Sequence, residues 1–180
     1  MSDSSISIVP KRSTYPQNET KAKEILDWLV SLDIIKPTPS DCILSEKSGY
    51  AISEGAREVV DDIETLPFHS TVNGLEIITE RRVFDTGENG MEKLICPNCK
   101  QDISGEEWSF FEEWDEGKSD NITCPLCNVA NDIHQFDFEP EWGFSDLGFR
   151  FWNWPPLNQS IINKFTQKLD CDVVVVFQHI

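Results

Sequence analysis

The sequence predicts an α+β fold: a small mixed sheet with packed helices and an inserted module built on four cysteines. Three observations support this class. Apolar residues recur at helical spacing in several segments, and runs of β-branched residues such as residues 173–177 are typical of strands. Two Cys-Pro-x-Cys pairs interrupt the middle of the chain. With 180 residues, 39% of them apolar, the chain is long enough to bury one substantial core.

The N-terminal part is expected to be mostly helical. Residues 1–19 are polar and lack periodicity, which predicts a disordered tail. A helix should follow, because apolar residues from Ala22 to Leu32 recur on one helical face. A second helix is expected to begin at Ser53 and to end before Pro67, since proline cannot continue a helix.

A β-hairpin should close this N-terminal part, which we place at residues 20–90. Residues 75–85 are rich in β-branched and apolar side chains, as strands are. The pair Asn89-Gly90 is a strong turn signal, and residues 91–95 would form the return strand. That strand would lead directly into the first cysteine.

The C-terminal part, residues 136–180, is expected to complete the core as a strand–helix–strand unit. Residues 149–154 indicate a strand, Pro155 and Pro156 suit the start of a helix, and residues 173–177 indicate a strand covered on both sides. A right-handed crossover would then place the two strands parallel to each other.

The central segment, residues 91–135, contains the four cysteines that we expect to bind metal. Cys96-Pro-Asn-Cys99 and Cys124-Pro-Leu-Cys127 are separated by 24 residues. The two-residue gap lets both sulfurs of a pair point into one tight turn, and two such turns make the four-thiolate cage that structural zinc prefers. We therefore predict one structural Zn²⁺ ion. Iron held by the same ligands and a redox-active Cys-x-x-Cys pair are the alternatives.

The two Cys-Pro-x-Cys turns, which we call knuckles, resemble those of the zinc-ribbon family over about residues 91–135. The resemblance implies a bound metal and a local hairpin geometry, and it implies no activity. Zinc ribbons often have glycine after each knuckle, where this chain has Lys100 and Asn128, and its spacer is longer than the common range. The stretch from Trp142 to Leu157 is similar to a family of uncharacterised bacterial proteins, which gives no function.

A short acidic helix is expected within the spacer, over residues 105–116. Ser104 and Glu107 match a capping box, and Gly117 is a typical C-terminal stop. Aromatic side chains surrounded by carboxylates suit a basic protein partner, although the aromatic residues would also suit burial against the main domain. The candidate partner-binding residues are Trp108, Phe110, Glu112, Glu113, Trp114, Asp115 and Glu116.

Charge and hydropathy exclude several classes of partner. The net charge is −17, and residues 96–135 carry two lysines against nine acids, a net of 2 − 9 = −7. Phosphate backbones and anionic membranes are bound by Lys and Arg, so we expect neither nucleic acid nor membrane as a partner. The sequence has no signal-peptide core and no run of about 18 apolar residues, which predicts a cytoplasmic location.

The function we expect is that of a non-catalytic, zinc-stabilised protein that binds a basic protein. A narrower form is an acidic inhibitor, such as an immunity protein directed against a nuclease-type toxin. None of the three histidines lies in a recognised catalytic or metal motif, and phosphate-binding loops are missing. A nucleic-acid-associated zinc ribbon and an enzyme of unknown class are the alternatives.

Overall fold

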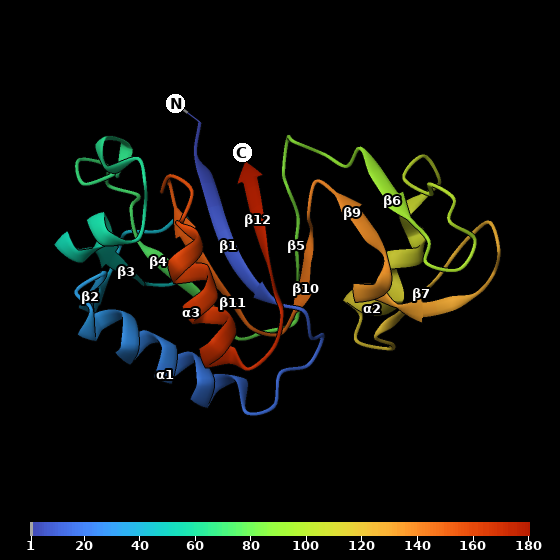
Figure 1. Cartoon of the computed structure of the whole chain (residues 1–180), viewed down its shortest axis with the longest axis horizontal. Helices are drawn as coiled ribbons and strands as arrows, with labels where there is room; N and C mark the ends of the chain where they lie inside the picture. Colours follow the sequence, from blue (N-terminus) through green and yellow to red (C-terminus); the bar gives the residue numbers. More distant parts are fainter. Residues whose placement is uncertain (1) are drawn as a thin grey trace.

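The computed structural model describes residues 2–180 and shows a larger and a smaller lobe side by side (Figure 1). The larger lobe is built on a six-stranded sheet of order β12-β1-β11-β4-β3-β2, in which neighbouring strands run antiparallel. The α+β class is confirmed. The strands of this sheet are β1 (Ser4–Pro10), β2 (Ile35–Ser40), β3 (Gly49–Ile52), β4 (Leu75–Ile78), β11 (Gly148–Trp152) and β12 (Val173–His179).

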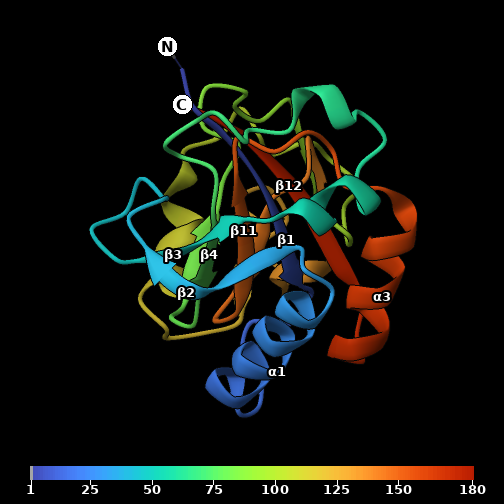
Figure 2. The ribbon, with the colours of Figure 1, turned by 90° about the vertical axis from the view of Figure 1, so that its left-hand side faces the viewer.

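Two α-helices, α1 (Asn18–Ser31) and α3 (Gln159–Leu169), contribute to the main core with one face of this sheet (Figure 2). The main core joins both helices to β1 and β11, and Ile8, Leu29 and Phe165 within it are fully buried. Burial of each such side chain stabilises the fold by about 1.5–3 kcal/mol. The larger lobe therefore has a core of its own, separate from the four cysteines of the two Cys-Pro-x-Cys pairs.

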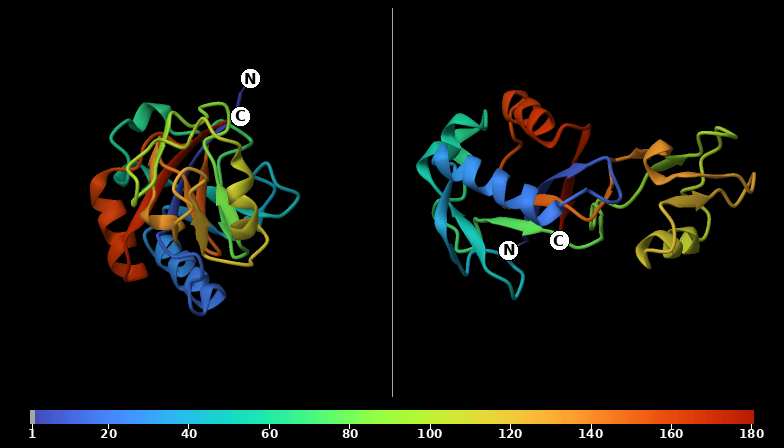
Figure 3. Two further views of the ribbon diagram at one scale, coloured as in Figure 1. Left: turned by 90° about the vertical axis from the view of Figure 1, so that its right-hand side faces the viewer. Right: turned by 90° about the horizontal axis from the view of Figure 1, so that it is seen from below.

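A two-stranded sheet, β5 (Arg82–Phe84) with β10 (Gly143–Ser145), packs on the opposite face. Two glycines allow the close approach: a Cβ atom at Gly148 would lie 2.3 Å from the Phe84 ring, and one at Gly143 would lie 2.9 Å from Val9. The same two strands lead the chain out to the smaller lobe and back, and Figure 3 shows that lobe at one end of the molecule.

The smaller lobe, which we call the cysteine module, comprises residues 93–139. Its strands pair as β6 (Lys93–Ile95) with β9 (Asp137–Glu139) and as β7 (Asn121–Thr123) with β8 (Ala130–Asp132). Its helical turns are η3 (Trp108–Phe111), α2 (Glu112–Asp115) and η4 (Ile133–Gln135). A second apolar core belongs mainly to this module: Leu94, Cys96, Ile103, Trp114, Ile122, Cys124, Ile133, Phe136, Phe138 and Phe144. The module therefore extends past the predicted end at residue 135, because β9 is the partner of β6.

The predicted disordered tail at residues 1–19 is wrong where β1 forms. Met1 lies outside the described residues, but β1 is an inner strand between β11 and β12, and Ile6, Ile8 and Val9 are 0–1% exposed. The physical reason is the alternation Ser-Ile-Ser-Ile, whose period of two residues places both isoleucines on the core face of a strand.

The strand–helix–strand unit is present as β11, α3 and β12, but its two strands are not neighbours. They run parallel because each pairs antiparallel with β1, which lies between them. As a result β12 is an edge strand, and Phe177 on it is 48% exposed rather than covered.

The predicted hairpin and the predicted second helix are wrong. The segment from residue 75 to residue 85 divides into β4 and β5, which belong to different sheets, and β6 pairs with β9 instead of returning along β5. The helix expected from Ser53 is replaced by the short 3₁₀ turns η1 (Glu54–Glu58) and η2 (Ile63–Thr65). Between them Val60 forms a β-bridge with Leu157, so tertiary pairing overrides the helical pattern. Among residues 2–180, no helix is both long and apolar enough to cross a membrane.

Candidate metal centre

The first cysteine knuckle is a tight turn at the end of β6. The amide of Lys100 donates to the Cys96 carbonyl at 3.0 Å, and the Cys96 amide donates to the Gln101 carbonyl at 3.1 Å. Lys100 has a φ of +61°, which is the left-handed conformation that glycine adopts most easily. The turn therefore accepts a lysine where zinc ribbons often have glycine, at a cost in backbone strain.

The second knuckle repeats this geometry at the end of β7. The Asn128 amide donates to the Cys124 carbonyl at 2.9 Å, the Cys124 amide donates to the Val129 carbonyl at 3.1 Å, and Asn128 has a φ of +60°. Asparagine tolerates this conformation better than most residues. β6 and β7 thus each lead into a knuckle of the same geometry, as the repeated Cys-Pro-x-Cys spacing predicts.

The four sulfurs come together in one cluster. The Sγ atoms of Cys96 and Cys127 are 3.8 Å apart, as are those of Cys99 and Cys124, and all four Sγ atoms lie within 4.8 Å of one another. A tetrahedral site with metal–sulfur bonds of about 2.3 Å has sulfur–sulfur edges of about 3.8 Å, so the spacing fits a four-coordinate metal ion. The two 3.8 Å contacts join opposite knuckles, which favours one shared metal over two separate redox dithiols.

Hydrogen-bond donors surround the sulfurs unequally. The Val129 amide and the Asn98 side chain, which lies 3.5 Å from the sulfur, lower the pKa of Cys127 to about 6. At Cys99 the Gln101 amide acts in the lowering direction, but desolvation and the three neighbouring thiols raise its pKa to about 11. Four thiols this close cannot all ionise without a cation, and a bound metal would stabilise all four thiolates.

Comparison with known proteins finds no relative of this chain. No family model, no curated protein and no solved structure matches it. Neither the zinc-ribbon resemblance nor the resemblance of the stretch from Trp142 to Leu157 gains support from a relative. The assignment of this site therefore rests on the cysteines and their surroundings.

Apolar side chains and a carboxylate support the cage from the β6 side. Leu94 and Ile103 are fully buried, and the Ile103 amide donates to the Leu94 carbonyl at 2.8 Å. Asp102 accepts from the amides of Leu94 and Ser104 at 3.1 and 2.9 Å, and hydrogen bonds from Ser104 and Leu94 lower the pKa of Asp102. The start of the spacer is thereby fixed on β6, immediately beside the first knuckle.

Because Ser104 is held there, it does not cap a helix. The predicted helix over residues 105–116 is shorter: η3 begins at Trp108, α2 follows it, and no side-chain cap is made at the start of either. The predicted stop is confirmed, since Gly117 has a φ of +74° and its amide donates to the Trp114 carbonyl at 3.0 Å. The result is a short acidic helical segment, preceded by the contacts of Asp102 and Ser104 beside β6 and ended by the turn at Gly117.

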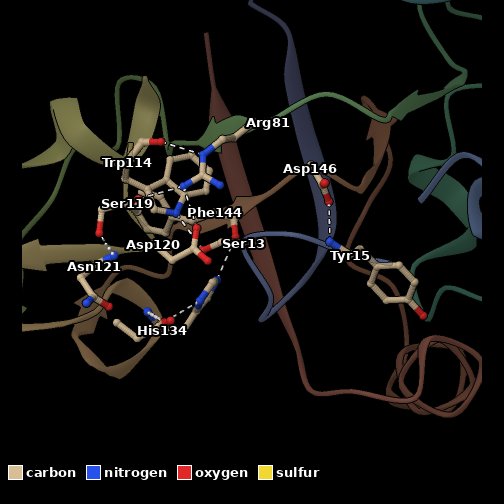
Figure 4. A network of polar contacts seen from close by, with 11 residues as sticks. Ser13, Tyr15, Arg81, Trp114, Ser119, Asp120, Asn121, His134, Phe144 and Asp146 are labelled. Carbon is tan, nitrogen blue, oxygen red and sulfur yellow. Dashed lines mark hydrogen bonds and ion pairs between the residues drawn. The ribbon is translucent and has the colours of Figure 1, made fainter. Parts of the chain in front are cut away.

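Trp114 joins the cysteine module to the larger lobe (Figure 4). Its side chain is 0% exposed, and its indole Nε1 donates to Ser13 Oγ at 2.8 Å. Arg81, from the β4–β5 connection, stacks on the indole at 4.1 Å and donates to the carbonyls of Trp114 and Ser119 at 2.7 and 3.0 Å. A further donor contact at 3.0 Å pairs Arg81 with Asp120. Trp114 therefore has a structural position, and its place in the predicted partner-binding set is wrong.

The other residues of that set stay near the surface. Trp108 is 42% exposed, and Phe110 is half-buried within an aromatic cluster that contains Phe111. The four acids of the set are exposed: Glu112, Glu113, Asp115 and Glu116. Lys118 forms an ion pair with Glu116, which neutralises part of this surface. We call Trp108, Phe110 and these four acids the acidic face.

His134 is a structural residue of the module. Its Nε2 lies 2.8 Å from the Phe144 carbonyl oxygen (Figure 4). Its Nδ1 lies 2.9 Å from Asp132 Oδ1. Both ring nitrogens are thus engaged away from the sulfurs. No sequence pattern indicates Arg81 or Ser13 as partners of Trp114, because 33 and 101 positions separate them from it along the chain.

The two remaining cysteines lie outside the cluster and are free. Cys42 is buried in a small core beside Trp152, and Cys171 is half-buried at the end of α3. Burial raises the pKa of Cys171, which disfavours its reactive thiolate form. Both therefore behave as core residues.

Proposed function

We propose that this chain is a non-catalytic, zinc-stabilised protein that binds a basic protein partner through the acidic face. The observation that carries the proposal is the exposure of Glu112, Glu113, Asp115 and Glu116 on a segment that the four-cysteine cluster and Trp114 hold in place. A strongly negative surface that also carries aromatic residues is complementary to Lys and Arg side chains.

Zinc is the metal that this ligand set favours. Four thiolates satisfy a tetrahedral cation completely, so they leave no coordination position for a substrate or a reactive water. The metal would then stabilise the module instead of catalysing a reaction. Iron uses the same ligands, and elemental analysis distinguishes the two.

A hollow beside the acidic face suits a basic side chain. It has a volume of about 190 Å³ and is lined by Glu107, Ser109, Phe110, Glu113, Thr123 and Pro125. A guanidinium or ammonium group entering it would meet the carboxylates of Glu107 and Glu113 and the ring of Phe110. Such contacts combine charge pairing with a cation–π interaction, which is worth about 0.5–2 kcal/mol.

The charge of the module disfavours the nucleic-acid alternative. Its seven excess negative charges over residues 96–135, from two lysines and nine acids, oppose the counterion release that drives binding to phosphate backbones. A gel-shift assay at about 50 mM salt is the direct test, because electrostatic binding is strongest at low salt.

Calorimetry with charge-reversed variants tests the proposal. A lysine-rich model peptide would be titrated into the wild type, into the triple variant Glu112→Lys, Glu113→Lys and Glu116→Lys, and into a control with three reversals on the larger lobe: Glu24→Lys, Asp27→Lys and Glu54→Lys. We expect salt-sensitive binding that the acidic-face variant loses and the control keeps. Equal loss in both variants would show that only the net charge matters, and the proposed surface would be refuted.

The narrower form of the proposal is an acidic inhibitor of the immunity-protein kind. Its support is the combination of high negative charge and a non-catalytic metal site. A purified basic nuclease that loses activity in the presence of the wild type, and keeps it in the presence of the acidic-face variant, would support this form.

A further inference from the structure

The edge strand β12 offers a second surface that is not part of the acidic face. β12 pairs with β1 along one side over its whole length, from the Ser4–His179 pair to the Pro10–Val173 pair. On its other side, within residues 2–180, the backbone pairs only at His179, which bridges to Gly87. An open edge of this kind is a template for an added strand.

Besides His179, three residues of β12 direct their amides to this open side. The amide of His179 donates to Thr86, away from β1, whereas the neighbouring amide of Ile180 donates to Asp3 beside β1. The N–H and C=O groups of successive residues in an antiparallel strand point to alternate sides, so those of Val173, Val175 and Phe177 point to the same side as those of His179. Their N–H and C=O groups therefore face away from β1.

A groove lies directly beside this edge. It has a volume of about 430 Å³, and Val175 and Phe177 form its apolar side, with Phe177 48% exposed. The rest of its lining comes from the end of the cysteine module and from the segments that lead to and from it: Asn89, Glu92, Glu139, Pro140 and Glu141. Three carboxylates and no basic residue line the groove, although Lys93 lies 3.9 Å from Glu139 at its margin.

We propose that this groove binds an extended, basic segment of a protein partner, which adds a strand to the free edge of β12. The added strand would bond to the outward backbone groups at Val175 and Phe177. Its apolar side chains would cover Phe177, and its Lys or Arg side chains would meet Glu92, Glu139 and Glu141. This inference rests on the proposed function for the basic character of the partner, and it assigns the partner a second contact.

A second copy of this chain is a poorer occupant of the groove. Pairing two β12 edges would bring the carboxylates of Glu92, Glu139 and Glu141 in each copy towards those of the other. Two chains of net charge −17 also repel each other over longer distances. A basic segment removes both costs.

The probe for the test is a short synthetic peptide of alternating valine and lysine, and its control is the same peptide N-methylated at alternate residues. N-methylation removes the amides needed for strand pairing while the charge is kept. We expect the unmodified peptide to bind with salt-sensitive affinity and to slow hydrogen exchange at the amides of Val173, Val175 and Phe177. The N-methylated peptide should do neither.

The variant Val175→Pro removes one outward amide, and Val175→Thr is its matched control because it keeps that amide. Proline is tolerated where an edge-strand N–H faces solvent. We expect Val175→Pro to weaken peptide binding about tenfold, since its ring also blocks the neighbouring contact, and Val175→Thr to change it little. The exchange measurement on the wild type decides the question if Val175→Pro does not fold.

Several results would overturn the inference. Unchanged exchange at β12, equal binding of the N-methylated peptide, or equal affinities of the two Val175 variants would each do so. A dimer in sedimentation that Phe177→Glu dissociates would assign the edge to a second copy instead. If the peptide binds and only the acidic-face variant abolishes binding, this inference fails and the proposed function stands; if no basic probe binds at all, both fail.

Discussion

Replacing Arg81 by alanine should loosen the junction between the two lobes. Arg81 contributes two hydrogen bonds to main-chain carbonyls, at Trp114 and Ser119, and a cation–π contact with the Trp114 ring at 4.1 Å. It also pairs with Asp120, whose side chain is 51% exposed. This one side chain thus joins the loop between β4 and β5 to both ends of the segment 114–120.

The expected cost follows from these contacts. Each hydrogen bond from a charged donor contributes about 1.5 kcal/mol, and the cation–π contact adds about 1 kcal/mol. The pair with the half-exposed Asp120 adds little, because solvent screens it. Some water would replace the lost donors, so we expect Arg81→Ala to lower the free energy of unfolding by about 3 kcal/mol. For a chain of this size that corresponds to a fall in Tm of about 6–12 °C.

Urea denaturation of the metal-loaded protein, followed by tryptophan fluorescence, measures this change. Arg81→Lys should recover less than half of the loss, because an ammonium group cannot serve both carbonyls and the ring at once. Lys23→Ala, which removes a single exposed pair with Asp27, is the control and should cost less than about 0.5 kcal/mol. A loss below about 1 kcal/mol for Arg81→Ala would refute the role given to this contact.

Three further predictions concern the sheet, the first knuckle and the metal. Ile8→Ala should cost about 2–5 kcal/mol in urea denaturation because Ile8 is fully buried on β1, and a loss near zero would mean that β1 is not part of the sheet. Lys100→Gly should raise the free energy of unfolding by up to about 1 kcal/mol, since glycine relieves the φ of +61°; a clear destabilisation would contradict this geometry. Metal affinity, measured by competition with a chromophoric chelator, should fall as the pH falls because protons compete for the thiolates. The pKa of Cys127 is lowered to about 6, so its thiolate, and the contribution of that thiolate to metal affinity, is present above that pH and is lost below it. A metal affinity that does not change from neutral to acid pH would contradict thiolate ligation.

The sequence was most informative where structure depends on near neighbours. The Cys-x-x-Cys spacing decides the knuckle turns by itself, because their hydrogen bonds join residues at most five positions apart. The stripes of α1 and α3 are similarly local, with Ile25, Leu29, Ile161 and Phe165 buried as the helical period requires. Gly117 marked the end of α2 for the same reason.

The structure differs from the sequence-based predictions where contacts between distant segments decide which strands and contacts form. β1 is stabilised by β11 and β12, which lie more than 130 residues away, so its short alternating pattern gave too weak a local indication. The turn at Asn89-Gly90 exists, but β6 turns away to pair with β9, and β5 pairs with β10. Likewise, the burial of Trp114 depends on Ser13 and Arg81, and no spacing rule joins those three positions.

The metal content of the purified protein tests the central claim most directly. Elemental analysis should find one zinc ion per chain in the wild type and none in the double variant Cys96→Ser and Cys124→Ser, whose cysteine module should also lose its protection from proteolysis. A wild-type protein without stoichiometric metal, or a double variant that refolds with the same stability, would contradict the account.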